Sequence, residues 1–382
     1  MSTPLARSEF EVVRQFVYLN HASAGVLPRA SVAAIEAFVR EHASGGVCGT
    51  YPYDLRLPEY REKIGRFIGT AGSQIALLTN TSAAAATVAA GLDWRPGDEV
   101  LLCDNEFPAN AVPWNALRRR GVRVRLVPTA EGRLTPELLA QQLSAQTRLV
   151  ALSWVSYADG YRHDLEPLAS VAHQAGALLC VDAMQGLGAF PIDVGRTNVD
   201  ALYAGGPKWL LALHGIALLY LSPHVSERLE LALPGWRSME DIWDFHNCEQ
   251  PYARDAARFE CGTPNLLGAI SLVAAIELFQ RSGPEAIAAH VLALTDRLCE
   301  GLAGLGAQLS TARGEGVSSG IVTFALPGLD SIELGRALER ENIVTTYRTG
   351  GVRVSPHGYN TADEIDLLLE RLANLASTKA LV

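Results

Sequence analysis

Lys208 is the residue whose type and surroundings most favour chemistry. The chain has only three lysines, at positions 63, 208 and 379. Lys208 follows an apolar run and the turn GGP at 205–207, and the apolar segment WLLALHG comes directly after it. Apolar surroundings lower the pKa of an amine, so this lysine could form an imine and later act as a general base. On these residues alone, a solvated lysine on a turn explains the pattern equally well.

A carboxylate stands in a comparable position on the preceding strand. Asp182 ends the apolar run ALLCVD, and the next run, DALYAG, leads to Lys208. Parallel strands of α/β proteins bind ligands at their C-terminal ends. There, Asp182 could keep the pyridine nitrogen of pyridoxal phosphate (PLP) protonated, and Gln185 could hydrogen-bond the O3′ oxygen of the ring. A simple strand-ending cap is an equally good interpretation of Asp182.

Two further segments could complete a cofactor site. The stretch TNTSAAAATVAAGL at 79–92 predicts a strand end followed by a helix N-terminus, where free N–H groups can bind phosphate. The candidate groups are the backbones of Ser82 and Ala83 and the hydroxyl of Thr81 or Ser82. Phe107 follows another strand and could stack on a cofactor ring. Most helix N-termini bind nothing and most phenylalanines pack in a core, so each signal alone is weak.

Arg353 lies in GGVRVSPHGYN, within a short predicted strand. A guanidinium beside apolar residues could bind a substrate carboxylate through two hydrogen bonds, or it could form a structural ion pair. Together with the groups above, it gives the set that a PLP enzyme acting on an amino acid requires. His21, Arg237 and His357 could also line the pocket, although structural roles are favoured for them.

The middle of the chain alternates short β-rich runs with amphipathic helices. This alternation is typical of βαβ units and predicts an α/β fold with a mainly parallel seven-stranded sheet. Beyond about residue 260, long helices and short strands indicate a smaller α+β domain. We expect a large domain over 17–255 and a small domain made of 1–16 and 256–382. The predicted strands of the sheet are 75–80, 99–103, 122–128, 148–155, 177–182, 200–205 and 215–221.

Composition excludes several classes of protein. The net charge of -9 disfavours binding to nucleic acid or to an anionic membrane. No apolar run has the length of a signal peptide core or a membrane span, so we expect a cytoplasmic protein. The six cysteines are widely spaced and the nine histidines are dispersed, which predicts no metal site. The segment GLGAFP at 186–191 lacks the third glycine of a nicotinamide-binding loop.

The motifs that carry these residues resemble those of the class V aminotransferase family of fold-type I PLP enzymes. This family includes cysteine desulfurases, selenocysteine lyase, kynureninase and isopenicillin N epimerase. The resemblance extends from YLNHASAGVLP at 18–28 to RVSPHGYNTADEID at 353–366. VDAMQ resembles the family's Asp-x-x-Gln motif, GGPKWL its lysine motif and RVSPHGYNT its arginine motif. The resemblance implies that Lys208 forms a Schiff base with PLP and that Arg353 binds the substrate carboxylate.

The same resemblance implies a homodimer. RFECGTPN at 258–265 looks like the family's Phe-Glu-x-Gly-Thr-Pro segment. In relatives, the threonine of that segment, here Thr263, reaches the phosphate of the neighbouring subunit's cofactor. The active sites would then be shared between two subunits.

Departures from the family pattern narrow the expected reaction. Phe107 stands where desulfurases often have a stacking histidine, and EFPANAVPW looks closer to the isopenicillin N epimerase-like branch. Gly205 and Pro207 replace a serine and a histidine of many relatives, so phosphate binding must rely more on Ser82 and Thr263. Tyr157 stands where relatives often have an asparagine near O3′.

The segment YRTGGVRVS at 347–355 is short and contains no cysteine, whereas desulfurases carry a mobile cysteine there. A desulfurase or selenocysteine lyase is therefore disfavoured. We expect Lys208 to remove the α-proton of an amino acid in an epimerase- or lyase-type reaction, with transamination as the next alternative. A PLP-fold binding protein without catalysis is a further alternative, and the retention of Lys208, Asp182 and Arg353 argues against it.

Overall fold

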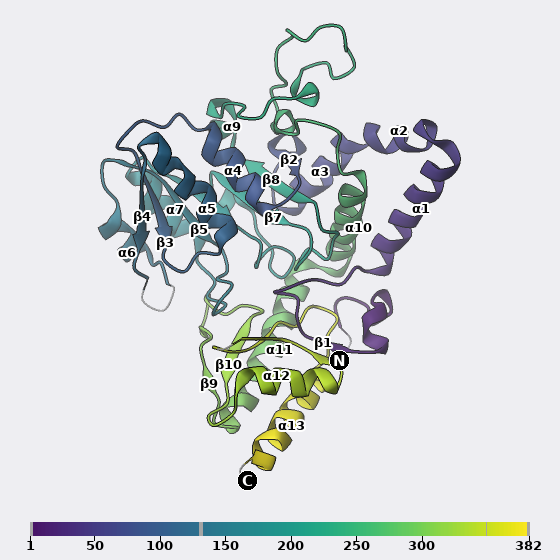
Figure 1. The fold of residues 1–382 in the computed structure, drawn as a ribbon, viewed down its shortest axis with the longest axis vertical. Helices are drawn as coiled ribbons and strands as arrows, with labels where there is room; N and C mark the ends of the chain where they lie inside the picture. Colours follow the sequence, from purple (N-terminus) through teal and green to yellow (C-terminus); the bar gives the residue numbers. More distant parts are fainter. Residues whose placement is uncertain (1–2, 130–132, 349, 380–382) are drawn as a thin grey trace.

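The computed structural model describes residues 3–129, 133–348 and 350–379. The chain forms a large part built on a central sheet and a smaller part that contains the C-terminus (Figure 1). The buried apolar residues form one cluster on each face of the central sheet and a third cluster in the small part.

The central sheet has seven strands in the order β2-β8-β7-β6-β5-β3-β4. All neighbouring pairs are parallel except that β8 is antiparallel to both β2 and β7. The predicted mainly parallel sheet is therefore confirmed, and only β5 extends beyond its predicted run, by one residue. In sheet order the strands are β2 (Ile75–Leu78), β8 (Ala217–Leu221), β7 (Ala201–Gly205), β6 (Leu178–Asp182), β5 (Thr147–Ser153), β3 (Glu99–Cys103) and β4 (Arg123–Val127).

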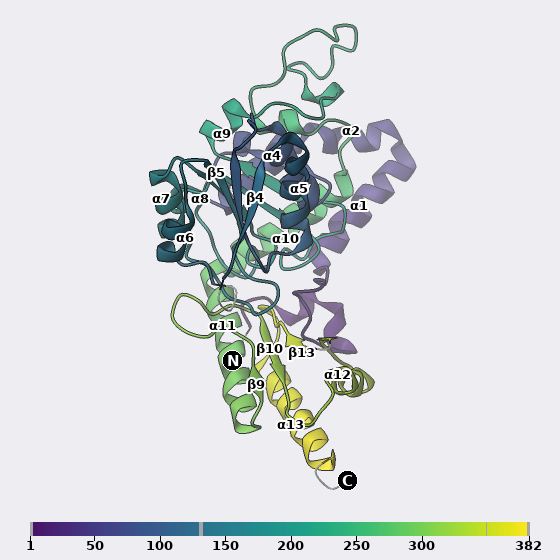
Figure 2. The same cartoon turned by 60° about the vertical axis from the view of Figure 1, so that its left-hand side comes forward.

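Helices cover both faces of this sheet, and alternate residues of each strand therefore pack into different clusters. On β5, Leu149 and Ala151 belong to one cluster, while Val150 and Leu152 belong to the other. Figure 2 shows α6 and α7 on one side of the sheet and α4 and α5 on the other. One face is covered by α4 (Thr81–Gly91), α5 (Pro108–Ala116) and α9 (Pro223–Arg228). The other is covered by α1 (Arg29–Gly45), α3 (Leu57–Phe67), α6 (Pro136–Gln142), α7 (Leu165–Gln174) and α10 (Leu266–Ser282).

The small part consists of helices packed on a second, antiparallel sheet. Its strand order is β12-β13-β10-β9, and the N-terminal strand β1 pairs in parallel with β11 beside it. The predicted α+β character of this region is thus observed. Its strands are β1 (Val17–Tyr18), β9 (Gln308–Leu309), β10 (Val322–Ala325), β11 (Ile343–Val344), β12 (Thr346–Arg348) and β13 (Gly351–Val354). Its helices are α11 (Pro284–Gly304), α12 (Ser331–Arg340) and α13 (Ala362–Lys379).

Two segments bear on where the domains divide. The first residues of the chain lie against the small part, since the Leu5 N–H donates to the Gly358 carbonyl and Arg7 pairs with Glu364. Helix α10, in contrast, packs on α1 and α3 and buries its apolar residues in the core of the large part. The division at residue 256 stays a prediction, and any boundary has to account for this packing of α10.

No single helix of the described residues is long and apolar enough to cross a membrane. Within the part of the chain that the structure describes, only the pair of α10 and α11 passes such a test together, and the two helices meet at an angle of 83°. Much of α10 is buried in the core described above, which is the ordinary place for such a helix in a globular protein.

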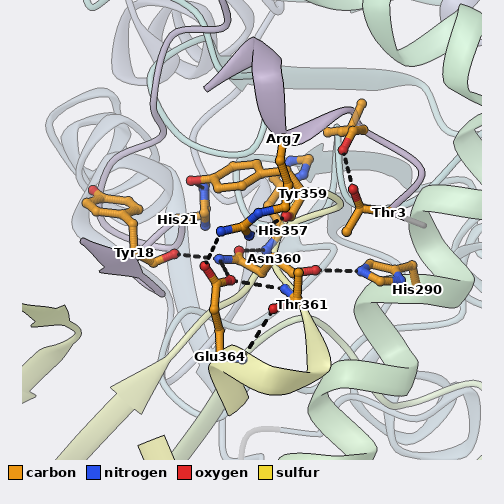
Figure 3. Close-up of polar contacts among 11 residues, drawn as sticks. Thr3, Arg7, Tyr18, His21, His290, His357, Tyr359, Asn360, Thr361 and Glu364 are labelled. Carbon is orange, nitrogen blue, oxygen red and sulfur yellow. Dashed lines mark hydrogen bonds and ion pairs between the residues drawn. The ribbon is translucent and has the colours of Figure 1, made fainter. Parts of the chain in front are cut away.

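Polar contacts around His21, Tyr359 and Asn360 connect the N-terminal segment with the residues after β13 (Figure 3). His21 contacts the Ser355 carbonyl through Nδ1 at 2.9 Å and the Tyr359 hydroxyl through Nε2 at 3.0 Å. His357 contacts the Trp209 carbonyl through Nε2 at 3.0 Å. Burial lowers the pKa of His21 well below 6.5 and that of His357 to about 4, so both rings are neutral near pH 7. Their role in this structure is to connect elements, as favoured from the sequence.

Candidate active site

Asp182 and Lys208 lie at the C-terminal ends of neighbouring parallel strands. Asp182 is the last residue of β6, and Lys208 follows the end of β7 by three residues. Burial raises the pKa of the Asp182 carboxyl to about 6, although a hydrogen bond from the Met184 N–H opposes this shift. Burial also lowers the pKa of the Lys208 amine to about 8. An acid and an amine with pKa values moved toward neutrality at neighbouring strand ends are typical of a catalytic centre.

The Lys208 turn is held from three sides. The Trp209 indole donates to Gln185 Oε1 at 2.8 Å, and the carbonyl of Trp209 contacts His357 as described above. The N–H of Gly25 donates to the Pro207 carbonyl at 2.8 Å. A Cβ atom on Gly25 would lie 2.0 Å from the Lys208 carbonyl oxygen, so only glycine permits this close approach. The N-terminal segment therefore fixes the backbone that carries the lysine.

The ring of Phe107 lies beside the Lys208 amine, and the ring of Tyr157 lies against Phe107. The Nζ atom lies 5.4 Å from the centroid of the Phe107 ring. Phe107 in turn makes an edge contact with Tyr157, with ring centroids 5.2 Å apart and planes at 73°. Phe107 is 40% exposed, so its ring is not consumed by core packing and is available for stacking. The structure thus places Phe107 next to Lys208 and Tyr157 next to Phe107, and the contacts of both rings with the cofactor stay predictions.

Glu106 is a second acid of the site that the sequence analysis missed. Its carboxylate accepts hydrogen bonds from the Ser153 backbone at 2.6 Å, the Ser153 hydroxyl at 2.7 Å and the Asn110 amide at 2.8 Å. Burial raises the pKa of Glu106 to about 7, and the nearby charge of Asp182 adds to this shift. Ser153 is paired in register with Asp182 on the neighbouring strand. Glu106 follows the end of β3 and precedes Phe107. The reasoning from strand ends that identified Asp182 would therefore have identified Glu106 as well.

The start of α4 differs in detail from the prediction. The N-cap is Asn80, whose side chain accepts the Ala83 N–H at 2.8 Å, so this backbone group already has a partner. The Ala83 N–H, a predicted phosphate donor, is therefore engaged by Asn80, and neither Thr81 nor Ser82 caps the helix. The N–H groups of Thr81 and Ser82 remain without a partner in the described chain, as expected for the first turn of a helix. These two residues can still receive an anion.

Thr81 lies close to the Lys208 strand. Its hydroxyl contacts the Met184 sulfur at 3.6 Å. A Cβ atom on Gly205 would lie 3.0 Å from Thr81 Oγ1 and 3.2 Å from the Met184 sulfur. The glycine that replaces the family's serine therefore makes room for Met184 at this end of the site.

Arg353 on β13 points from the small part toward the large part. Its Nη1 donates to the Tyr157 carbonyl at 2.9 Å, and its Nη2 donates to the Ser23 hydroxyl at 2.8 Å. The Nε atom is buried and has no partner among the described residues. Burial lowers the pKa of Arg353 to about 10, and the charge of Arg348 adds to this shift. A buried donor without an acceptor is costly, so an incoming carboxylate would satisfy it.

The remaining predicted residues have other surroundings. Gln185 uses its amide for Trp209 and for the Ala22 carbonyl at 3.0 Å, so its predicted bond to O3′ stays a prediction. Thr263 is exposed and lines an apolar groove beside α4 together with Ala83, and this groove is not lined by Lys208. Arg237 forms an ion pair with Asp54 at 3.0 Å. No group of three histidine, cysteine or acidic side chains that could hold a metal occurs in the described ranges.

These groups fit PLP. A buried carboxylate with a raised pKa matches a protonated pyridine nitrogen, because the opposite charge would favour its ionised form. The half-exposed Phe107 matches a flat ring, and the free N–H groups of α4 match a phosphate. Lys208 supplies the amine that the aldehyde of the cofactor requires. One chain therefore offers groups suited to the ring, the phosphate and the aldehyde of the cofactor.

Comparisons with known proteins agree with this assignment. The aminotransferase class-V family model matches residues 17–368. A probable cysteine desulfurase of Methanothermobacter thermautotrophicus is 32% identical over 400 residues, which cover 98% of each chain. The isopenicillin N epimerase of Streptomyces clavuligerus is 31% identical over 384 residues, covering 93% of this chain and 94% of the relative.

A solved structure is similar over the whole fold. The cystine C-S lyase C-DES, in complex with its product cysteine persulfide, superimposes with a TM-score of 0.88 at 25% identity. The match covers 96% of this chain and 99% of C-DES. The expected fold type I is thereby confirmed. The chain belongs to the class V aminotransferase family of PLP-dependent enzymes.

Proposed function

We propose that this enzyme removes the α-proton of an amino acid with Lys208 and then releases a leaving group from the β-carbon, which is a lyase-type reaction. The observation that carries the proposal is the buried Lys208 amine, whose pKa is lowered to about 8, next to Asp182. An amine with a pKa near neutrality is present in its free form in a substantial fraction of molecules. It can therefore accept a proton at the working pH.

Each residue of the proposed site has a separate role in this reaction. PLP, when bound, supplies an electron-withdrawing ring joined to the amino group of the substrate. Asp182 would keep the ring nitrogen protonated, Phe107 would cover the ring, and Thr81 and Ser82 would hold the phosphate. Arg353 would hold the substrate carboxylate through its free Nε. Lys208 would take the proton from Cα and, in the lyase reaction, give it to the group that departs from the β-carbon, so that this group leaves in its protonated form.

A persulfide relay is not favoured by the arrangement of thiols. The β12–β13 hairpin that bears Arg353 has no cysteine in its sequence. The exposed cysteines are Cys48, Cys248 and Cys261, and all three lie outside this hairpin. Lyase chemistry needs no enzyme thiol, and the similar C-DES is named a C-S lyase. The desulfurase names among the relatives are compatible with the same first proton transfer.

Epimerisation is the second candidate. Return of the proton to the opposite face of Cα requires a second acid, and the Tyr157 phenol next to Phe107 is a candidate group. The similarity to an isopenicillin N epimerase supports this alternative. Transamination has no specific observation in its favour.

We also propose a homodimer with shared sites. The support is the exposed position of Thr263 on an apolar groove formed with Leu78, Ala86 and Leu233. Apolar grooves of this kind are typical of subunit interfaces. Thr263 could then bind the phosphate of the cofactor in the neighbouring subunit, as the resemblance implies. Size measurement in solution, with and without Thr263→Ala, tests this part.

The function is tested with purified protein supplied with PLP. A violet-region absorption band should form in the wild type and in Lys63→Ala, and it should be missing in Lys208→Ala. A screen of L-amino acids in D₂O should show exchange of the α-hydrogen, and the products decide the branch. A keto acid with ammonia and no co-substrate indicates a lyase, and a D-isomer indicates an epimerase. Absence of the band in the wild type would contradict PLP dependence, and a band without α-exchange would contradict the base role of Lys208.

A further inference from the structure

The β12–β13 hairpin carries two arginines on one face. In the register of the hairpin, Arg348 is opposite Gly351 and Thr346 is opposite Arg353. Residues opposite each other share a face, and so do residues two apart on one strand. Arg348 and Arg353 are therefore diagonal neighbours on the same face.

This face is turned toward the active site. Tyr347, on the other face of the hairpin, packs against α12, since a Cβ atom on Gly335 would lie 2.0 Å from its ring. Arg353, in contrast, reaches Tyr157 and Ser23, and the Thr346 hydroxyl also contacts the Ser23 hydroxyl, at 2.6 Å. Arg348 thus projects on the side where Arg353 meets the loop of Tyr157. Its charge also lowers the pKa of both Lys208 and Arg353.

Neither arginine is neutralised by the chain. Within the residues that the structure describes, no carboxylate forms an ion pair with Arg348 or Arg353. Two like charges on one face repel each other, and Lys208 adds a third positive group nearby. The two acids of the site do not balance this charge. Asp182 lies at the end of β6, and Glu106 accepts hydrogen bonds from Ser153 and Asn110. The face therefore has more positive charge than the α-carboxylate of a substrate can balance.

We propose that Arg348 binds a second anionic group, at the end of the substrate side chain, while Arg353 binds the α-carboxylate. The substrate class is then an α-amino acid with an acidic side chain. This inference rests on the proposed function, because it takes Arg353 as the α-carboxylate site. Residues diagonal across an antiparallel pair are about 7–8 Å apart at Cα, and flexible arginine side chains can span the separation of the two carboxylates in a short dicarboxylic acid.

Binding of unreactive acids to the PLP-loaded enzyme tests the proposal without turnover. Glutarate carries two carboxylates and butyrate carries one, and neither has an amino group. By calorimetry, we expect the wild type to bind glutarate about tenfold more tightly than butyrate, the preference that one charged hydrogen bond provides. Arg348→Gln should remove this preference and leave butyrate binding within about twofold, and Arg348→Lys should keep part of it. Arg340→Gln serves as the control, because it replaces an exposed arginine at the end of α12 and changes the net charge by the same amount as Arg348→Gln.

The same comparison with substrates uses L-glutamate against L-glutamine and L-aspartate against L-asparagine. These amino acids have no leaving group at the β-carbon, so the reaction followed is exchange of the α-hydrogen in D₂O. Arg348→Gln should raise the apparent KM of this exchange for the acidic member of each pair and leave that of the amide member unchanged. Equal binding of glutarate and butyrate by the wild type would overturn the proposal. So would an Arg348→Gln variant that weakens both acids equally, since both arginines would then serve one carboxylate. Failure of the proposed function shows itself differently, as a missing absorption band or missing α-exchange in the wild type.

Discussion

Arg353 on β13 donates a hydrogen bond of 2.9 Å to the carbonyl oxygen of Tyr157 in the loop after β5. The ring of Tyr157 touches Phe107, and the Phe107 ring lies 5.4 Å from the Lys208 amine. The residue expected to hold the substrate carboxylate is thus connected, through two aromatic rings, to the lysine expected to take the proton. Movement of the small part relative to the large part would disturb both groups together.

Asp182 should control both cofactor binding and turnover. Asp182→Asn should lower kcat by about 100-fold or more, because it removes a preorganised charge partner from an enclosed site. With a pKa of about 6, the carboxyl of the cofactor-free protein gains a proton as the pH falls through that value. We therefore expect PLP affinity to fall below about pH 6 in the wild type, as measured by fluorescence titration. The exposed Asp244→Asn serves as the control, and a kcat within threefold of wild type in Asp182→Asn would refute the role.

Capture of PLP by the cofactor-free protein should depend on pH through Lys208. Only the unprotonated amine attacks an aldehyde, and burial lowers the pKa of Lys208 to about 8. The rate constant for formation of the violet-region band should therefore rise with pH, with a midpoint near 8. An ordinary lysine would give a midpoint near about 10.4. Stopped-flow mixing across this range distinguishes the two values.

Glu106 should stabilise the site as well as serve it. Glu106→Ala leaves the Ser153 N–H and the Asn110 amide without their acceptor, which should lower the free energy of unfolding by about 3 kcal/mol. Glu106→Gln keeps one acceptor oxygen and should cost less. Urea denaturation measures both effects, with the exposed Glu315→Ala as control. A loss in Glu106→Ala no larger than in this control would show that the hydrogen bonds contribute nothing measurable.

His357 should make the protein sensitive to acid. The folded pKa is about 4, whereas an unfolded histidine titrates near about 6.5, so the unfolded chain gains a proton first as the pH falls. The resulting loss of stability begins below about pH 6.5, grows down to about pH 4 and totals roughly 3 kcal/mol. The urea midpoint should therefore fall less steeply between pH 6.5 and 4 in His357→Gln than in wild type. The exposed His246→Gln should behave as wild type, and equal slopes in all three proteins would contradict the prediction.

Local patterns in the sequence determined much of the fold and the centre of the site. The apolar runs predicted all seven strands of the central sheet, because burial on both faces demands continuous apolar residues. The order of strand and helix then placed Asp182 and Lys208 at neighbouring strand ends, where the structure has them. The same argument would have reached Glu106, since its strand end was visible as well.

Contacts between distant parts of the chain were decided only by the tertiary structure. Two such contacts are the hydrogen bond from Trp209 to Gln185 and the close approach of Gly25 to Lys208. Each depends on how segments distant in the sequence pack against one another. The pairing of Arg348 with Arg353 on one face depends on the register of a hairpin, and a shift of one residue would turn Arg348 away. Such choices follow from packing of whole elements against one another. The sequence was sufficient to identify Lys208 and Asp182. The tertiary structure determines which further charged groups surround them.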